Sequence, residues 1–522
     1  MQSETANRDV ARAWAYHDAT KHSAWSMRAD AHYLDWANQP FPLKIYTSID
    51  PIPLPRESDQ TGIAALSAIS QESIEINAES IPTLKELASI LYFSAGITKK
   101  KPYTGGEIYF RAASCTGALY QFELYLVTGD LPDLEAGLYH FGPGDFSLRL
   151  LRKGDYRGVL VHATAGEPSV THAPVTIVCA GTYWRNSWKY RARTYRHFGW
   201  DNGTMLANML AMTAAHRFPA KIICGFVDSE VNRLLDVDPE REVAFSMAAI
   251  GHAKSGPPDA PRDMPTLNLP TVPLSQSEVD YPALRAIHEA SSLWAPDEVA
   301  EWRGGPRMTP TTRTSISAIG VVGGLLPFPS EAMPRDTIEQ VILRRGSSRK
   351  FERHSISFEQ LSVILHSSTQ GIPADFLDPL GAQLNDLYVL VNAVGGLNPG
   401  AYVFQRDKGA LECLKEGQFR NEAQYLGLQQ DLPGDAAADI FFLADLNPIL
   451  KRFGNRGYRA VQLESGIIGG KLYLAAYAQH LGATGLTFFD DDVINFFSPH
   501  SKGKSAIFLV ALGKGQKMTF IP

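Results

Sequence analysis

Apolar residues recur at helical spacing in two stretches that lie far apart in the chain. The first stretch contains Leu84, Leu87, Ile90 and Leu91. The second stretch contains Phe358, Leu361, Ile364 and Leu365, so that each member matches one in the first at the same offset in residue number. Positions three and four residues apart share one face of an α-helix. The pattern therefore predicts two amphipathic helices, over residues 84–95 and 358–368.

A similar succession of apolar runs follows each predicted helix. Such runs predict strands, and the first set covers residues 122–128, 137–141, 175–180, 221–226 and 242–251. The second set covers residues 387–391, 400–404, 440–443, 485–489 and 505–513. A long helix is expected before the last two strands of each set, over residues 201–217 and 462–481. Helices packed on an antiparallel-rich sheet define an α+β fold, which the sequence predicts twice.

The two sets of elements also share residues at one constant offset in residue number. Seven landmarks keep this offset, from Glu123-Leu124-Tyr125 and Asp386-Leu387-Tyr388 to Phe226-x-Asp228 and Phe489-x-Asp491. This agreement indicates an internal repeat. The offset of the landmarks is smaller than the offset of the two opening helices. An indel of about eleven residues is therefore expected between these anchors.

Proline marks the segment between the two copies. Residues 256–335 contain Gly256-Pro257-Pro258, Pro261, Pro265, Pro270 and Pro273, which is typical of a linker. One short helix is expected within it, over residues 281–293. The predicted organisation is an N-terminal domain over residues 1–255, a Pro-rich linker over residues 256–335 and a C-terminal domain over residues 336–522.

Composition and charge narrow the class of protein. With 522 residues the chain is too long for one hydrophobic core. Its net charge of −6 argues against general nucleic-acid binding, which needs a basic face. The four cysteines form no CxxC pair, and neither a signal peptide nor a membrane helix is recognisable. We therefore expect a cytoplasmic protein with reduced thiols and no metal site, which binds neither nucleic acid nor membrane.

Basic side chains are concentrated in the run Arg344-Arg345-Gly346-Ser347-Ser348-Arg349-Lys350-Phe351, directly after a predicted helical turn over residues 338–343. Asp336 is the expected N-cap of that turn. Guanidinium groups bind phosphate in a bidentate fashion, and serine hydroxyls add donors. The run is therefore a candidate phosphate site. The alternative is a solvated basic loop at a helix C-terminus, where cations are also favoured.

The repeat provides a comparison for this run. At the offset of the opening helices, residues 344–349 correspond to Ser70-Gln71-Glu72-Ser73-Ile74-Glu75. The first copy has no arginine there, and Glu72 and Glu75 would repel a phosphate. The residues themselves thus predict one anionic, phosphate-bearing ligand near the start of the second copy.

The run Arg345-x-Ser347-x-Arg349-x-Phe351, followed by an amphipathic helix, resembles the entry motif of the nitroreductase superfamily. The N-terminal half resembles the SagB-type, thiazoline-oxidase-like branch in the segments Tyr16-His17-x-x-Thr20-Lys21-His22-Ser23, Leu34-Asp35-Trp36-Ala37, Lys44-x-Tyr46 and Trp188-Lys189-Tyr190-x-x-Arg193-x-Tyr195-Arg196. Residues 111–120 resemble the branch's Arg-x-x-Pro-Ser-x-Gly-Ala loop, with Ser114-Cys115 in place of Pro-Ser. The resemblance covers most of the chain.

The resemblance implies FMN bound at a dimer interface, with phosphate-binding residues from one copy and a ring-contacting loop from the other. In this chain the two halves would act as the two subunits of an intramolecular pseudo-dimer. The implied residues of the intact site are Arg345, Gly346, Ser347, Arg349, Thr484, Gly485, Lys514 or Lys517, Ser114, Thr116 and Gly117. A strand-entry turn is the alternative for residues 482–485, and a solvated terminal side chain is the alternative for each lysine. The second site, which would pair Glu72 and Glu75 with residues 377–380, is expected to be empty.

In the SagB-type branch a Lys-Tyr pair is assigned to proton transfer, and Lys189-Tyr190 corresponds to it. In the second copy Arg452-Phe453 replaces this pair. The resemblance thus implies that Lys189 and Tyr190 are the catalytic residues. The alternatives are a surface ion pair for Lys189 and core packing for Tyr190.

These observations favour an FMN-dependent oxidoreductase that transfers hydride between the flavin and a small-molecule or modified-peptide substrate. No GxGxxG motif follows a predicted strand, so NAD(P)H, if it is the reductant, would bind transiently over the flavin. The alternative functions are a degenerate flavin-binding protein and a non-catalytic subunit of a peptide-modifying complex. A further homodimer of the whole chain is left open.

Overall fold

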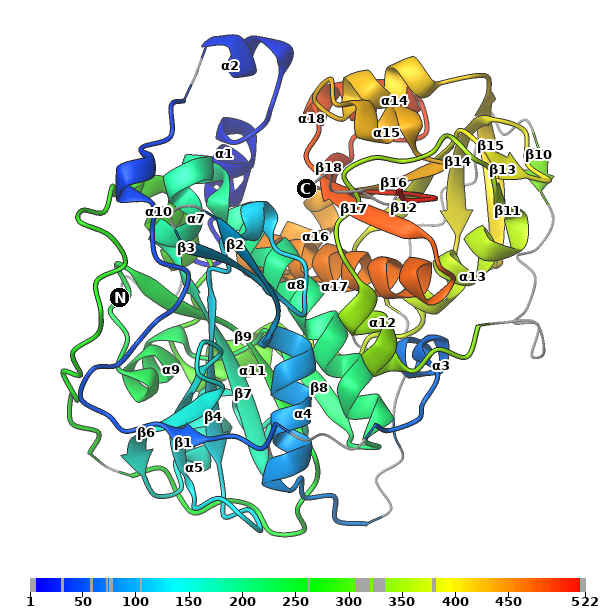
Figure 1. The fold of residues 1–522 in the computed structure, drawn as a ribbon. Helices are drawn as coiled ribbons and strands as arrows, with labels where there is room; N and C mark the ends of the chain where they lie inside the picture. Colours follow the sequence, from blue (N-terminus) through cyan, green and yellow to red (C-terminus); the bar gives the residue numbers. More distant parts are fainter. Residues whose placement is uncertain are drawn as a thin grey trace.

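The fold is described from a computed structural model of the chain. The structure describes residues 6–29, 32–56, 60–71, 74, 78–103, 106–261, 263–305, 320–322, 334–377 and 382–516. Two antiparallel sheets of seven strands dominate it, one in each half of the chain. Two long helices lie side by side between the sheets (Figure 1). The α+β fold class is confirmed.

The N-terminal sheet has the strand order β1-β6-β5-β4-β7-β9-β8. Its strands are β1 (Ile52–Pro53), β4 (Phe122–Thr128), β5 (Gly137–Gly142), β6 (Ser147–Lys153), β7 (Val175–Thr182), β8 (Ala220–Ile223) and β9 (Glu242–Ile250). The helices of this half are α3 (Ala65–Ser70), α4 (Leu84–Ala95), α5 (Arg157–Ala163), α6 (Pro168–Thr171), α7 (Tyr183–Tyr190), α8 (Thr194–Ala215) and α9 (Asp228–Leu235). Strands β4, β7 and β9 are buried along their whole length, which places the core of this half on both faces of its sheet.

The C-terminal sheet has the matching order β10-β15-β14-β12-β16-β18-β17. Its strands are β10 (Gly320–Val322), β12 (Asp386–Val391), β14 (Gly400–Gln405), β15 (Ala410–Glu416), β16 (Ala438–Ala444), β17 (Gly482–Leu486) and β18 (Ser505–Gly513). The helices are α12 (Ile338–Arg344), α13 (Phe358–Thr369), α14 (Arg420–Leu426), α15 (Asp431–Asp435), α16 (Leu446–Phe453), α17 (Arg456–Ala478) and α18 (Asp490–Phe497). The two halves therefore share one topology, as the constant offset of their landmarks predicts.

The long helices α8 and α17 cross where glycine allows their backbones to touch. A Cβ atom on Gly203 would lie 2.5 Å from backbone atoms of Gly466. A Cβ atom on Gly466 would lie 2.4 Å from the carbonyl oxygen of Gly199. Gly203 and Gly466 are also one of the landmark pairs of the repeat. The point of closest approach is thus the same position in both copies, as on a two-fold axis.

One pair of buried arginines ties each long helix to the opposite half. Arg456 and Arg459 of α17 form ion pairs with Asp228 at the start of α9. Helix α8 binds the start of α18 in the same way, through Arg193, Arg196 and Asp490. The predicted landmark pair Asp228 and Asp491 is therefore wrong by one residue, since Asp490 makes the equivalent contact. The contact is made in both directions, as in an interface between identical subunits.

The segment between two helices binds each of these buried aspartates. His22 lies between α1 (Ala11–Ala19) and α2 (Ala24–Ala29), and Leu293 lies between α10 (Pro282–Ala290) and α11 (Pro296–Gly304). The backbone N–H of His22 donates to Asp490 Oδ2 at 2.8 Å, and that of Leu293 donates to Asp228 Oδ2 at 3.0 Å. The offset in residue number from His22 to Leu293 equals that between the first residues of α1 and α10. The repeat thus extends into the segment predicted to be a linker.

The helix predicted over residues 281–293 is confirmed as α10, whereas α11 was not predicted. Both helices contribute buried side chains to the protein core, including Leu284 and Trp302. The boundaries at residues 255 and 335 remain a prediction. Among the described residues, no helix is both long and apolar enough to cross a membrane.

The predicted indel coincides with a hairpin present in one half. Strands β2 (Ile97–Tyr103) and β3 (Gly106–Arg111) form a separate two-stranded antiparallel sheet between α4 and β4. The C-terminal half places only residues 370–385 between its corresponding elements, α13 and β12. A smaller sheet of β11 (Ile356–Ser357) and β13 (Val394–Gly395) completes the described strands. The change of offset between the opening helices and the landmarks therefore has a structural cause.

Candidate functional site

The basic run begins where α12 ends and runs along the edge of the C-terminal sheet. The N-cap of α12 is Thr337, which forms a capping box with Gln340, so the prediction of Asp336 as the cap is wrong. Asp336 instead accepts a hydrogen bond from Arg344 at 2.6 Å. The N–H of Ser348 donates to the Ala483 carbonyl of β17 at 3.0 Å. This contact fixes the run beside residues 482–485.

Arg345 reaches across to the N-terminal half. Its Nε donates to the Ala112 carbonyl at 2.9 Å, and one terminal nitrogen donates to the Arg111 carbonyl at 3.2 Å. These carbonyls open the loop that contains Ser114, Thr116 and Gly117. The candidate phosphate run and the candidate ring-contacting loop, predicted from different halves, are therefore joined by Arg345. Two of the guanidinium's donors are already used in this contact.

Tyr473 of α17 lies at the centre of the site and was not identified from the sequence. Its hydroxyl lies 3.3 Å from Ser347 Oγ and accepts a hydrogen bond from the N–H of Gly485. The guanidinium carbon of Arg345 lies 5.9 Å from the centre of its ring. The residue at the same place in the first copy is Leu210, which has no hydroxyl. This difference between the copies is the signal by which the sequence could have revealed Tyr473.

The loop of the N-terminal half is held by Asp201 of α8. Asp201 Oδ1 accepts hydrogen bonds from the N–H and the hydroxyl of Thr116, both at 2.8 Å. Its Oδ2 accepts from Gln121 at 2.5 Å and from the Cys115 thiol at 3.2 Å. Burial raises the pKa of Asp201 to about 6, against the effect of these hydrogen bonds. Glu464, its counterpart in α17, binds Leu384 and Asn385 in the same manner, which indicates a structural role for both carboxylates.

Lys189 and Tyr190 end α7 and face the basic run. A Cβ atom on Gly117 would lie 3.1 Å from the Tyr190 hydroxyl, so the loop passes directly over that ring. Burial lowers the pKa of the Lys189 ammonium, and the positive charge of Arg349 lowers it further. Burial also raises the pKa of the Tyr190 hydroxyl, an effect that Arg349 opposes. Within the described part of the chain Lys189 has no ion pair, so the surface ion pair considered as its alternative is not found.

The remaining predicted site residues differ in their exposure to solvent. Ser347, Gly117 and Arg349 are exposed, and Gly346 and Ser114 are half-buried. Thr484 is buried within β17, so residues 482–485 form the strand itself and not a turn before it. Lys514 lies 3.3 Å from Glu352 in a solvent-exposed ion pair. Lys517 lies outside the described residues, as do Glu72, Glu75 and residues 378–380.

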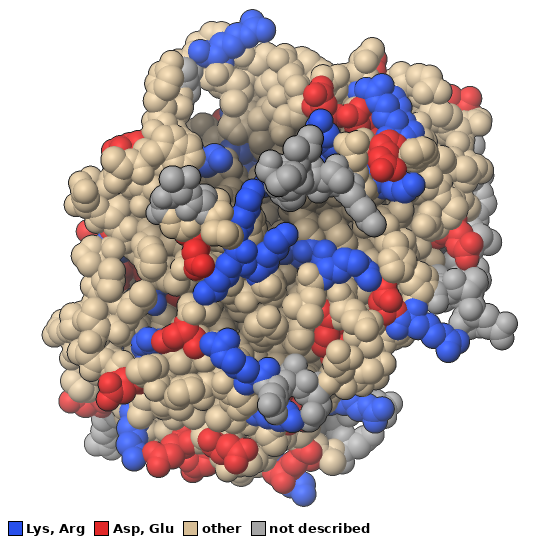
Figure 2. Space-filling view, in the orientation of Figure 1, with Lys and Arg blue, Asp and Glu red and all other residues tan. Residues whose placement is uncertain are grey.

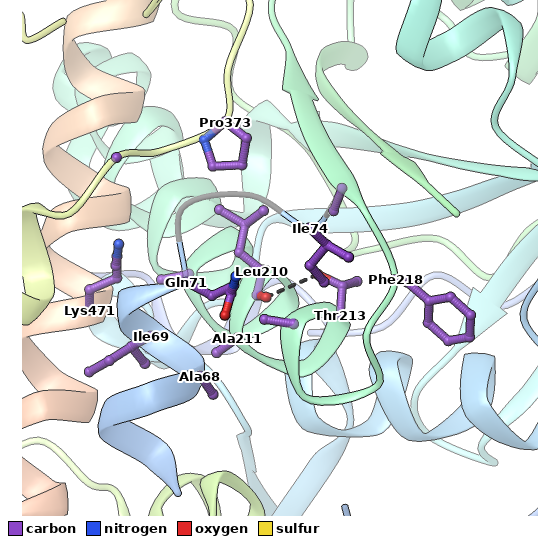
Figure 3. A pocket seen from close by; sticks show the side chains of 14 residues that line it. Ala68, Ile69, Gln71, Ile74, Leu210, Ala211, Thr213, Phe218, Pro373 and Lys471 are labelled. Atoms are coloured by element: carbon purple, nitrogen blue, oxygen red, sulfur yellow. Dashed lines mark hydrogen bonds between the residues drawn. The ribbon is translucent and has the colours of Figure 1, made fainter. Parts of the chain in front are cut away.

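The counterparts of Arg345 and Tyr473 in the other copy line a small pocket, whose lining is largely apolar (Figure 3). Gln71 stands at the position of Arg345, and Leu210 at that of Tyr473. Ala374 pairs with Ile222 of β8, and Asp375 accepts hydrogen bonds from the N–H groups of Cys224 and Gly225 at 2.9 and 2.8 Å. The loop around Ala374 and Asp375 is thus hydrogen-bonded to β8 and the residues after it. At the other site the equivalent strand, β17, contacts Tyr473 instead.

Helix α11 covers the counterparts of Lys189 and Tyr190. The Arg452 guanidinium donates to the carbonyls of Trp302 and Arg303 at 2.6 and 3.0 Å. The Trp302 ring lies 5.3 Å from that of Phe453 and is fully buried. The two equivalent sites therefore differ in chemistry. One holds Arg345 and Tyr473, whereas the other holds Gln71 and Leu210 and has α11 over the counterparts of Lys189 and Tyr190.

Positive charge is concentrated on one face of the protein. Lys and Arg side chains form a band across the middle of the face shown in Figure 2, where the two halves of Figure 1 meet. No cluster of His, Cys, Asp and Glu suited to a metal ion occurs among the residues that the structure describes.

Comparison with known proteins finds a family match in the C-terminal half and a solved structure that resembles the whole chain. Residues 342–514 match the model of the nitroreductase family. A protein of Methanocaldococcus jannaschii that is named as a nitroreductase is 24% identical over 169 residues, which are 32% of this chain and 82% of that relative. A crystal structure described as a nitroreductase of Anabaena variabilis has a TM-score of 0.75 and 26% identity, and the match covers 97% of this chain and 99% of that one. A nitroreductase-family domain therefore lies in the C-terminal half, and the fold of the whole chain is shared with the Anabaena protein.

Proposed function

We propose that this protein is an FMN-dependent oxidoreductase whose two halves form an intramolecular pseudo-dimer with one composite flavin site. The observation that carries the proposal is the pair of hydrogen bonds by which Arg345 of the basic run binds the Ala112 and Arg111 carbonyls of the other half. The positive charge of Arg349, in the same run, acts on two groups of the other half: it adds to the lowering of the Lys189 pKa by burial, and it opposes the raising of the Tyr190 pKa by burial. The substrate class is a small molecule or a modified peptide, and the SagB-type branch is the assignment that the N-terminal segments support.

The residues present fit a flavin mononucleotide. Ser347 and Arg349 are exposed, and Arg349 forms no ion pair or hydrogen bond with the described residues, so a hydroxyl and a guanidinium remain for a phosphate. Tyr473 lies beside Ser347 in the C-terminal half, and the Tyr190 ring lies beside Gly117 in the N-terminal half. Bound FMN would supply the hydride chemistry, and the protein would supply orientation, electrostatics and access.

Lys189 and Tyr190 are suited to proton transfer at the substrate. Because burial and Arg349 lower the pKa of Lys189, its ammonium gives up a proton more readily than that of an exposed lysine does. The raised pKa of Tyr190 keeps its hydroxyl protonated and able to donate. The rings of Tyr190 and His197 are 4.6 Å apart and perpendicular, which fixes the tyrosine.

The ratio of flavin to protein tests this proposal. Because Gln71 and Leu210 replace Arg345 and Tyr473 at the second site, we expect about one FMN per chain, measured by absorption after release of the flavin. A ratio near two would contradict the single composite site. A protein that stays colourless after incubation with FMN would contradict the oxidoreductase assignment as a whole.

A further inference from the structure

Tyr473 connects the basic run to strand β17 through its hydroxyl group. That hydroxyl accepts a hydrogen bond from the Gly485 N–H and lies 3.3 Å from Ser347 Oγ. Tyr473 is only 3% exposed, whereas Ser347 is exposed. A buried tyrosine hydroxyl thus lies directly behind a serine hydroxyl that faces solvent.

The first copy satisfies the equivalent strand N–H in a different way. At the landmark offset Gly485 corresponds to Ile222 of β8, and Tyr473 corresponds to Leu210. The Ile222 N–H donates to the Pro373 carbonyl of the other half at 2.8 Å. Leu210 and Pro373 both line the small pocket shown in Figure 3. The same strand N–H is therefore bound by a backbone carbonyl in one copy and by a hydroxyl in the other.

A hydroxyl differs from a carbonyl because it can donate as well as accept. The Pro373 carbonyl can only accept, so the hydrogen bonding ends there in the first copy. The Tyr473 oxygen accepts from Gly485 and still has its own proton to donate. Among the described residues, Ser347 is the one further hydrogen-bond partner of the Tyr473 hydroxyl. A tyrosine at this position therefore extends the hydrogen bonding from β17 to Ser347.

The hydrogen bond between Tyr473 and Ser347 can run in two directions, and a bound phosphate selects one of them. Each hydroxyl has one proton, so either oxygen can be the donor. A phosphate dianion has only acceptors, so Ser347 has to donate its proton to the phosphate. Ser347 Oγ then accepts the proton of Tyr473. The resulting chain runs from the Gly485 N–H through both hydroxyls to the phosphate, and each bond in such a chain polarises the next.

We propose that Tyr473 is a positioning residue for the phosphate of the flavin and that it acts through Ser347. The inference rests on the proposed function. By donating to Ser347 Oγ, Tyr473 directs the serine proton towards the phosphate and away from the protein. Tyr473 therefore favours a flavin that carries a phosphate over riboflavin, which carries none.

Titration of the full-length protein with FMN and with riboflavin tests the inference. The variant is Tyr473→Phe, which removes the hydroxyl but keeps the ring, whose centre lies 5.9 Å from the Arg345 guanidinium carbon. We expect the variant to bind FMN about five- to tenfold more weakly than the parent protein does. Its affinity for riboflavin should stay within about twofold of the parent. Flavin fluorescence measures both affinities, and their ratio isolates the contribution of the phosphate.

A buried tyrosine elsewhere in the same half provides the matched control. The Tyr402 hydroxyl of β14 donates to the Asn398 carbonyl at 2.7 Å, and Tyr402 is 1% exposed. Tyr402→Phe thus removes the hydroxyl of a buried tyrosine, together with its hydrogen bond, outside the site. This variant should bind both flavins as the parent protein does.

A double-mutant cycle tests whether Tyr473 acts through Ser347. Ser347→Ala should weaken FMN binding by itself. Adding Tyr473→Phe to Ser347→Ala should then change the FMN affinity by less than about twofold, because the serine that the tyrosine positions is no longer present. Fully additive losses would show that the two residues act independently, and the inference would be wrong.

A role for Tyr473 in holding β17 alone predicts a different result. Without the hydroxyl the Gly485 N–H would lose its acceptor, and FMN and riboflavin would then lose affinity alike. Equal losses for the two flavins, or an unchanged FMN affinity in Tyr473→Phe, would therefore overturn the inference, as would a parent protein that binds both flavins equally well. Failure of the proposed function is distinguishable, because the parent protein would then bind neither flavin.

Discussion

Replacing Asp228 by alanine is expected to lower the free energy of unfolding by about 3–5 kcal/mol, the cost of breaking a buried ion pair from one side. Asp228 is buried and receives Arg456 and Arg459 from the opposite half. Without it, two guanidinium groups would remain buried without their counter-charge. Chemical denaturation of the purified protein measures the change.

An exposed ion pair provides the matched control for this substitution. Asp280 lies 2.6 Å from Arg285, and the two side chains are 54% and 36% exposed. Replacing Asp280 by alanine should cost no more than about 1 kcal/mol, because solvent screens the pair. Equal effects at Asp228 and Asp280 would show that the buried arginines do not hold the halves together.

The equivalent contact at Asp490 gives this stability a pH dependence. Burial raises the pKa of Asp490, but the positive charges of Arg193 and Arg196 outweigh the effect of burial and lower the pKa to about 2. A carboxyl group whose pKa is lowered by folding stabilises the protein above its unfolded pKa of about 3.9. This stabilisation is lost as the pH falls from about 4 towards 2. In the Asp490→Ala variant that part of the acid sensitivity should be missing.

The sequence predicts the fold well where apolar spacing decides the structure. Helices α4 and α13 match their predicted spans closely, and β4 and β18 match theirs. The long helices begin at Thr194 and Arg456, earlier than predicted. The prediction missed their first turns because these turns carry arginines. Polarity along the chain marks such residues as exposed, whereas the structure buries them against aspartates of the other half. Pairing across hundreds of residues is not visible in local periodicity.

The site was predicted in outline and missed in its details. The basic run and the loop around Gly117 were identified from different halves, and Arg345 joins them in the structure. Tyr473 was missed because a tyrosine in an apolar helix resembles a core residue. Comparing it with Leu210 shows the difference, but the importance of that difference depends on knowing that Ser347 lies 3.3 Å away. Distances between segments far apart in sequence are supplied by the fold alone.

Replacing Arg349 by alanine is expected to weaken FMN binding by about 10- to 100-fold while leaving stability within about 0.5 kcal/mol of the parent. A charge-assisted hydrogen bond contributes about 1.5–3 kcal/mol, and each 1.4 kcal/mol is a factor of about ten. Arg349 is exposed and forms no ion pair or hydrogen bond with the described residues, so the folded protein loses little without it. Flavin fluorescence titration and denaturation of the same variants measure the two effects.

Replacing Arg345 separates binding from structure, because its guanidinium bonds the two halves to each other. The Arg345→Ala variant should lose both stability and FMN affinity, whereas Arg349→Ala should lose affinity alone. Arg353, which is 69% exposed and pairs with Asp435, is the matched control and should change neither quantity when it is replaced by alanine. Arg349→Lys should recover part of the affinity, since lysine keeps the charge but not the bidentate geometry. If Arg349→Ala binds FMN as tightly as Arg353→Ala does, the phosphate does not lie at the basic run, and the composite site must be abandoned.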